Sequence, residues 1–217
     1  MQLDQNQILA MLVGASFAAG LNVYATVATL GLLGQAGVVS LPANLHLLQN
    51  WWVIAISGVL FAVEFVADKI PAFDLIWNAL HTFVRVPVAA LIAYNATSNL
   101  SPPAQMLSAA LGGVIALVAH GSKTAVRAAV TPSPEPVSNI ALSVGEDAAA
   151  IGLTWFATKH PILAATITIV LLVLAILLIR TLWGALKRLF RGARNAATSL
   201  VHHPNSQVLS ESENRSN

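Results

Sequence analysis

The chain has 217 residues, of which 56% are hydrophobic and 9% are charged, and its mean hydropathy is +0.72. An ordinary soluble domain carries about 25% charged residues. This composition therefore excludes a soluble enzyme and predicts a protein whose main partner is the lipid bilayer. The formal net charge of only +2 argues against a nucleic-acid partner, and the absence of cysteine excludes disulfides and thiolate chemistry.

Apolar stretches recur along the chain, and a membrane-spanning helix needs about 20 such residues. They cover residues 8–34, 51–67, 84–96, 104–119, 140–157 and 162–179. The sequence therefore predicts an all-α integral membrane protein with about six transmembrane or partly re-entrant helices. Residues 1–194 are expected to form a single helical membrane domain, and the polar segment 195–217 a disordered cytoplasmic tail.

The positions of Lys and Arg predict the orientation of these spans. If the N-terminus lies in the cytoplasm and six spans alternate, all the basic residues except Lys159 fall inside. Basic residues collect in cytoplasmic loops, so both termini are expected in the cytoplasm. The first apolar stretch is not expected to be a signal peptide, because no Lys or Arg precedes it.

Six spans divide into halves of three, 1–100 and 101–194. An odd number of spans per half places the two halves in opposite orientations, which is the geometry of an inverted-topology repeat. Each half has a first helix interrupted by polar residues, a second helix with acidic residues and an apolar third. A 3+3 inverted repeat and a chance likeness both remain open.

Charged side chains at membrane depth are costly and therefore mark candidate functional residues. Glu64 and Asp68 are four residues apart, which places both carboxylates on one helical face. Two stacked carboxylates are suited to half of a cation site or to a proton relay. The alternative is a helix end near the cytoplasm, with Asp68 in water and Lys69 reaching the interface.

A second acidic pair, Glu146 and Asp147, lies in the middle of the fifth apolar stretch. Asn139, Ser143 and Asp147 form a polar stripe at intervals of four residues, with Glu146 on its flank. Such a stripe is expected to face the protein interior or a water path. The alternative is an ion pair to a basic residue that only holds helices together.

Basic and polar residues on two other segments are candidates for the opposite charge. His120, Lys123 and Arg127 share a face at the end of the fourth stretch; they are expected either in the cytoplasm or in contact with the acids. Residues 71–87 form an amphipathic helix with a polar face of Asp74, Asn78, His81 and Arg85. That helix is interfacial, re-entrant or continuous through Pro87. Asn22 lies at mid-depth in the first stretch.

Known catalytic and nucleotide-binding motifs are missing from the sequence. It contains no Gly-x-Ser-x-Gly, no His-Glu-x-x-His, no Walker loop and no dinucleotide fingerprint. The chain is therefore not expected to be an enzyme, and no cofactor is expected. The sequence assigns no metal.

The chain resembles a bacterial membrane protein family, domain of unknown function 4126, over most of residues 8–180. The matching segments are Ala18-Ala19-Gly20-Leu21 with Tyr24, Val63-Glu64-Phe65-Val66-Ala67-Asp68-Lys69-Ile70-Pro71 with Asp74, His81-Thr82-Phe83-Val84-Arg85, His120 with Lys123 and Arg127, and Ser143 with Glu146-Asp147. The resemblance implies an integral protein of the bacterial inner membrane and supplies no activity.

A weaker similarity is to cation/proton exchangers with Glu-x-Gly-Asp-Lys-Thr in inverted repeats. The acids Glu64 and Asp68 are four residues apart rather than three, and the Gly and Thr are missing. This departure argues against cation exchange by the same motif.

The function predicted from these residues is a small secondary transporter or channel-like carrier for an ion or small solute. Glu64, Asp68, Glu146, Asp147, Asn139, Ser143 and Asn22 are the predicted binding residues. Lys123, Arg127, His120, Asp74, His81 and Arg85 are the predicted counter-charges or gating residues. The alternative is a structural or assembly module whose ion pairs hold helices together without flux. An intramembrane enzyme ranks last. A homodimer is also expected, because six short helices enclose little volume.

Overall fold

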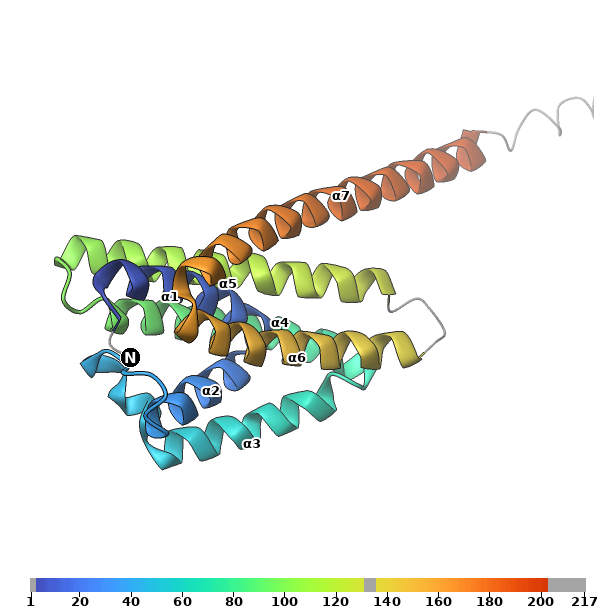
Figure 1. The fold of residues 1–217 in the computed structure, drawn as a ribbon. Coiled ribbons are helices and arrows are strands. Elements are labelled where there is room, and N and C mark those ends of the chain that lie inside the picture. Colours follow the sequence, from blue (N-terminus) through green and yellow to red (C-terminus); the bar gives the residue numbers. More distant parts are fainter. Residues whose placement is uncertain (1–2, 131–135, 203–217) are drawn as a thin grey trace, which may run out of the picture. The chain divides into compact units, whose positions relative to one another are not determined.

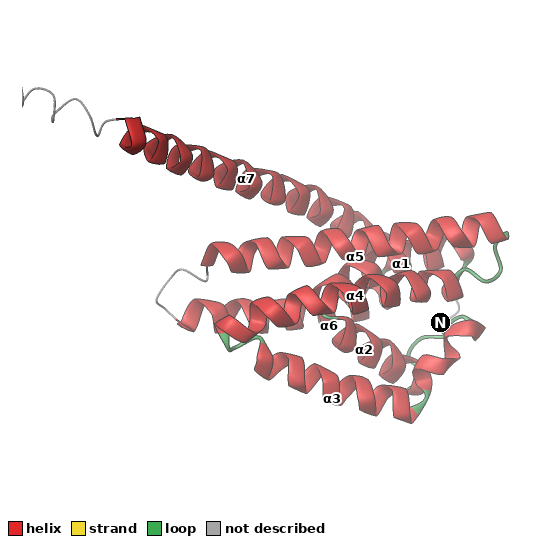
Figure 2. Ribbon diagram, turned by 180° about the vertical axis from the view of Figure 1, so that it is seen from behind, coloured by secondary structure: helices red, strands yellow, loops and turns green. Residues whose placement is uncertain are grey.

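All regular structure in the described residues of the computed structural model is helical, as the sequence predicts (Figures 1 and 2). The structure describes residues 3–130 and 136–202; it leaves out the side chains of 71–76, 128, 130, 136–139, 189, 193 and 195–202. The helices are α1 (Gln5–Leu21), α2 (Val23–Gln35), the 3-10 helix η1 (Ala43–Gln49), α3 (Trp51–Ala67), α4 (Pro71–Ala96), α5 (Pro102–Val130), α6 (Pro136–Lys159) and α7 (Pro161–His202).

Within the described residues, four helices are long and apolar enough to cross a membrane: Trp77–Ala96, Pro102–Arg127, Ile140–Lys159 and Pro161–Gly192. A fifth candidate is the pair η1 and α3, which meet at an angle of 61°. The structure thus supports a helical membrane protein with four or five spans, and the expected count of about six is not confirmed. The difference lies in the first apolar stretch.

That first stretch is two helices rather than one. Asn22 separates α1 from α2 with an extended backbone (φ −150°, ψ 105°). Its side-chain Oδ1 accepts a hydrogen bond of 2.9 Å from the backbone N–H of Ala25, and Asn is among the best residues for capping a helix start in this way. The 13 residues of α2 extend about 20 Å, too short for a hydrocarbon core of about 30 Å.

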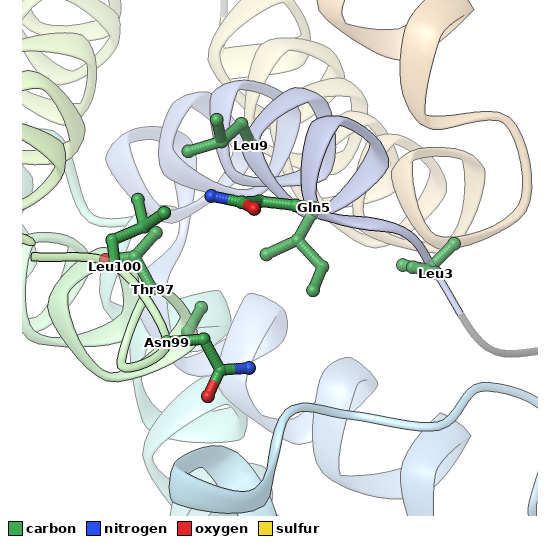
Figure 3. A pocket seen from close by; sticks show the side chains of 8 residues that line it. Leu3, Gln5, Leu9, Thr97, Asn99 and Leu100 are labelled. Carbon is green, nitrogen blue, oxygen red and sulfur yellow. The ribbon is translucent and has the colours of Figure 1, made fainter. Parts of the chain in front are cut away.

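The two short helices run in opposite directions and form a hairpin with its tip at Asn22. The start of α1 lies beside the connection between α4 and α5, where Gln5 and Leu9 line a pocket of about 150 Å³ with Leu100 (Figure 3). The chain beyond α2 returns to the same end of the bundle, because Lys159 Nζ, at the end of α6, donates to the carbonyl oxygen of Val38 at 3.3 Å.

The bundle therefore has two ends. The 97–101 end holds the start of α1, the α4–α5 connection and the end of α6. The 68–71 end holds the α3–α4 connection, the end of α5 and the start of α6. The start of α1 thus lies at the opposite end of the bundle from Lys69 and Arg127, whereas charge counting places the N-terminus and these basic residues on the same side. The prediction of a common side for the N-terminus and the basic loops assumed a full first span, which the break at Asn22 removes.

The amphipathic segment 71–87 is part of one continuous helix. α4 begins with Pro71 in its first turn and runs through Pro87 to Ala96. Proline is well tolerated at a helix start, because an N–H group there would have no acceptor within the helix. Of the three arrangements that the sequence left open, the structure has the continuous one.

Close packing brings the hairpin tip against α5. A side chain at Gly20 would collide with the backbone oxygen of Ala116, and its Cβ would lie 2.6 Å from the Cβ of Ala119. Small residues allow helices to approach closely in membranes. Gly20 therefore permits the end of α1 to lie directly on the α5 turn that precedes His120 and Lys123.

The C-terminal part of the chain forms a second unit. Residues Met1–Leu178 are one compact unit and Ile179–Asn217 another. The backbone of α7 is helical through His202, into the segment predicted as a tail, and residues 203–217 lie outside the described residues. The inverted repeat stays a prediction. Residues 1–100 begin with the hairpin of the two short helices α1 and α2, whereas residues 101–194 begin with the continuous helix α5.

Candidate functional site

Among the side chains that the structure describes, seven charged groups from four helices meet inside the bundle, and we call this group the charged network. Its members are Glu64 and Asp68 from the end of α3, Arg85 from α4, Lys123 and Arg127 from α5, and Glu146 and Asp147 from α6. Six of the seven are at most 3% exposed, and the Glu146 side chain is 12% exposed. Of the two places that the sequence left open for the basic face, the structure has the contact with the acids, and Asp68 is buried rather than solvated.

Lys123 is the centre of the network. Its Nζ lies 2.9 Å from Asp68 Oδ2, 3.4 Å from Glu146 Oε2 and 3.6 Å from Glu64 Oε1. These carboxylates come from two helices that are far apart in the sequence. One ammonium group thus holds α3 and α6 to α5.

Two arginines complete the ion pairs around Lys123. Arg85 donates from Nη2 to Glu64 Oε1, and both side chains are fully buried. Arg127 Nη2 lies 3.0 Å from Asp68 Oδ2 and 2.6 Å from Glu146 Oε2, while its Nη1 donates to the backbone oxygen of Asp68 at 3.0 Å. Because burial removes most of the solvation of these side chains, each charge depends on its partners.

Asp68 caps α3 one residue beyond the helix, at the 68–71 end. Burial alone would raise the pKa of its carboxyl group. The charges of Lys123 and Arg127 outweigh burial and hold the pKa below the ordinary value for aspartate.

The hairpin tip contributes backbone oxygens to the same network. Lys123 Nζ donates to the oxygen of Leu21 at 3.3 Å, and Arg85 Nη1 donates to that of Gly20 at 3.4 Å. These carbonyls end α1, where the last oxygens have no partner within the helix and the helix dipole is negative. The two cations therefore stabilise a helix end inside the bundle.

Asn22 links the tip to α6. Its Nδ2 donates to Asp147 Oδ1 at 2.8 Å, while its Oδ1 holds the first turn of α2. Asn22 itself is fully buried. One side chain thus both caps α2 and binds an acid of the network.

His120 extends the network toward α4. Its Nδ1 lies 2.7 Å from Arg85 Nη1 and must accept, because a guanidinium only donates. Its Nε2 therefore carries the proton and donates to the backbone oxygen of Asn78 at 3.1 Å. The hydroxyl oxygen of Thr82 lies 2.8 Å from the same Nε2. His120 is a neutral positioning residue for Arg85 in this arrangement.

The other predicted residues occupy different places. His81 lies outside the ion pairs; its Nδ1 donates to the backbone oxygen of Trp77, and Tyr24 OH donates to its Nε2 at 3.1 Å. Ser143 is fully buried on α6, and its Oγ has no hydrogen-bond partner. The side chains of Asp74 and Asn139 lie outside the described residues.

Several buried oxygens of the network have no hydrogen-bond partner within the described part of the chain. They are Glu64 Oε2, Asp68 Oδ1 and Asp147 Oδ2. Counted over these described side chains, the four acids also outnumber the three cations, which gives a formal charge of −1. Buried acceptors without donors, in a group with excess negative charge, are places that a proton or cation can occupy.

Sequence reasoning missed the backbone part of the site. The oxygens of Gly20 and Leu21 are available only because the helix breaks at Asn22, whereas the apolar pattern of residues 8–34 predicts a single span. The one available signal was an Asn at mid-depth, since Asn favours helix starts over helix interiors.

The model of the DUF4126 family, a domain of unknown function, matches residues 9–181 of this chain. The chain belongs to this family. Every member of the charged network and the whole α1–α2 tip lie inside the matched residues. No curated protein and no solved structure matches the chain significantly.

Proposed function

We propose that the protein is a small secondary transporter or channel-like carrier for an ion or small solute. The observation that supports this proposal is the meeting of four carboxylates, three of them buried, with three cations and the tip of a broken helix pair. The carrier would work in the bacterial inner membrane as an integral protein whose partners are the bilayer and the solute.

The cost of the network supports a functional role. Each buried ion loses several kcal/mol of solvation, of order 20 kcal/mol in the idealised limit, and ion pairs repay this only with good geometry. Hydrophobic residues of similar volume often stabilise a fold as well or better. Ionisable residues within membrane spans accordingly mark ion or proton pathways.

The break at Asn22 supports transport in particular. In many transporters, binding sites lie near mid-membrane at discontinuous helices, whose free carbonyls and N–H groups face the bound ion or solute. Here the oxygens of Gly20 and Leu21 face Arg85 and Lys123. A cation or proton that reaches the acids would compete with Lys123 for them and so release the hairpin tip.

The structural module remains the second candidate, and one observation favours it. Glu64, Asp68 and Glu146 each have a cation partner, so the network also explains how α3, α5 and α6 are held together. This candidate needs no flux.

Charge counting orients the proposed carrier with its 68–71 end in the cytoplasm. The first basic residue is Lys69, so the reversed start of α1 does not change the count. The start of α1 then faces outward. A homodimer stays a prediction, which cross-linking in native membranes would test.

Flux measurements on purified protein in liposomes test the proposal. Currents on a supported membrane would be recorded for Na⁺, K⁺, H⁺, chloride and small organic ions, with E64Q and E146Q as test variants and D4N as the control. Asp4 is an exposed acid at the start of α1. We expect wild type and D4N to move at least one of these ions and the test variants to lose that current. Equal currents in all four proteins would overturn the proposal.

A further inference from the structure

Asp147 differs from the other acids of the network. It is 3% exposed, and no ion pair joins it to a cation within the described residues, whereas Glu64, Asp68 and Glu146 all have one. Its Oδ1 accepts from Asn22, and its Oδ2 has no hydrogen-bond partner. Asp147 is therefore a buried carboxylate held by a single neutral donor.

The charged groups around Asp147 do not compensate its charge. Lys123 on α5 attracts it through space, but Glu64 and Asp68 on α3 repel it, and Lys123 is already shared among three other carboxylates. Glu146 precedes it on α6. A buried carboxylate without a paired cation is costly, and the usual solution is to take up a proton.

We propose that Asp147 is the proton-binding residue of this protein and that Asn22 transmits its charge to the tip of the α1–α2 hairpin. The role in coupled transport rests on the proposed function, whereas the proton site itself does not. The site comprises Asp147 Oδ2, which holds the proton, and Asp147 Oδ1, which remains bonded to Asn22.

The chemical step is a simple protonation. A hydronium ion transfers one proton to Oδ2: its O–H bond breaks, an O–H bond forms on the carboxyl group, a water molecule is left, and the side chain changes from a charge of −1 to neutral. The hydrogen bond from Asn22 Nδ2 loses its charged acceptor, and a bond to a charged group is roughly twice as strong as a neutral one. Because the same Asn22 side chain caps Ala25, the first turn of α2 is then held less tightly.

The chemistry of the surrounding atoms favours a proton over a metal ion. Ca²⁺ takes six to eight oxygen ligands and Mg²⁺ takes six. Near Asp147 on α6, the unpartnered oxygens are Asp147 Oδ2 and, one turn earlier, Ser143 Oγ. In the part of the chain that the structure describes, no group of three or more His, Asp or Glu side chains is placed to hold a metal.

Infrared difference spectroscopy in lipid nanodiscs tests the proton site without any transported solute. Protonated carboxyl groups have a carbonyl band that carboxylates lack, so spectra would be taken while the pH is lowered from neutral. We expect a band in wild type that is absent in D147N, shifted in D147E and retained in the matched control E146Q. A band that survives in D147N, or no band in folded wild type, would overturn the proposal. Suppression of the band by Na⁺ at constant pH would also overturn it, in favour of a sodium site.

A distance measurement tests the role of Asn22. The chain has no cysteine, so spin labels at L32C on α2 and V59C on α3, both exposed positions, can be placed without background. We expect the distance distribution to change on acidification in wild type, to be fixed in the acidic form in D147N, and to lose its pH response in N22A. An unchanged response in N22A would contradict the role of Asn22.

The two experiments separate this inference from the proposed function. The infrared band needs no flux, so its loss in D147N would stand even if no ion moved in liposomes. Flux in wild type without any Asp147 band would leave the carrier in place and remove the proton site.

Discussion

At the scale of single residues, Arg85 and Glu64 are one pair of the network in which neither side chain is exposed. Both Arg85 and Glu64 are fully buried, and they form a direct ion pair. Removing one member of a buried pair leaves an uncompensated charge and typically costs about 3–5 kcal/mol.

We therefore predict that R85M lowers the free energy of unfolding by about 3–5 kcal/mol, and that the double variant R85M/E64Q recovers much of this loss. Denaturant unfolding in detergent micelles measures both. The control is R180M, at an exposed arginine in α7. A double variant no more stable than R85M would contradict the direct pairing, and so would an R85M variant as stable as wild type.

Asp68 gives the fold a dependence on acid. Because its pKa is held below the ordinary value, ionised Asp68 contributes stability above the unfolded-state pKa, about 4, and this contribution is lost as the pH falls through the lower, folded-state pKa.

Wild type is therefore expected to lose stability below about pH 4. D68N, already uncharged, is expected to be less stable at neutral pH and to have a smaller slope in the same range. Thermal unfolding at a series of pH values is the measurement. A slope in D68N as steep as in wild type would assign the acid sensitivity to other carboxylates.

At the scale of elements, the α1–α2 hairpin is the feature with the clearest topological consequence. A full first span would place the start of α1 at the 68–71 end, whereas the break at Asn22 places it at the 97–101 end. Chemical labelling from one side of the membrane distinguishes the full first span from the hairpin.

We expect Q5C and N99C to react with a membrane-impermeant thiol reagent from one side of oriented vesicles, and I70C to react from the other. The cysteine-free chain makes each variant unambiguous, and Ile70 is exposed at the 68–71 end. Reaction of Q5C from the same side as I70C would restore the full first span and contradict the hairpin.

The elements show where sequence reasoning succeeds and where it fails. Long apolar runs and the spacing of Glu64 and Asp68 follow from local periodicity, so the helices and the shared carboxylate face were predictable. Charge counting could not detect the hairpin, because the chain has no Lys or Arg before Lys69. The pairing of Arg85 with Glu64 depends on α3 packing beside α4, which no local pattern encodes.

At the scale of the whole molecule, the charged network is a single feature with two possible purposes. It ties the hairpin tip and four helices together, and it also holds excess negative charge where a proton or solute can bind. The sequence predicted both readings, and the structure brings the residues together. Stability alone does not separate the two, because both need intact ion pairs.

Ion flux separates the structural role of the network from its binding role, and the current of a charge-swap variant is the most direct measurement. The double variant E64R/R85E keeps the pair but reverses its direction, and its folding would be checked by unfolding in micelles before its ion currents are recorded in liposomes. As a carrier, the protein is predicted to lose its current even where the swap restores the fold, because the acid no longer lies beside Lys123. A refolded swap variant with the full wild-type current would contradict the central claim that the network is a binding site, and so would a wild-type protein that moves no ion at all.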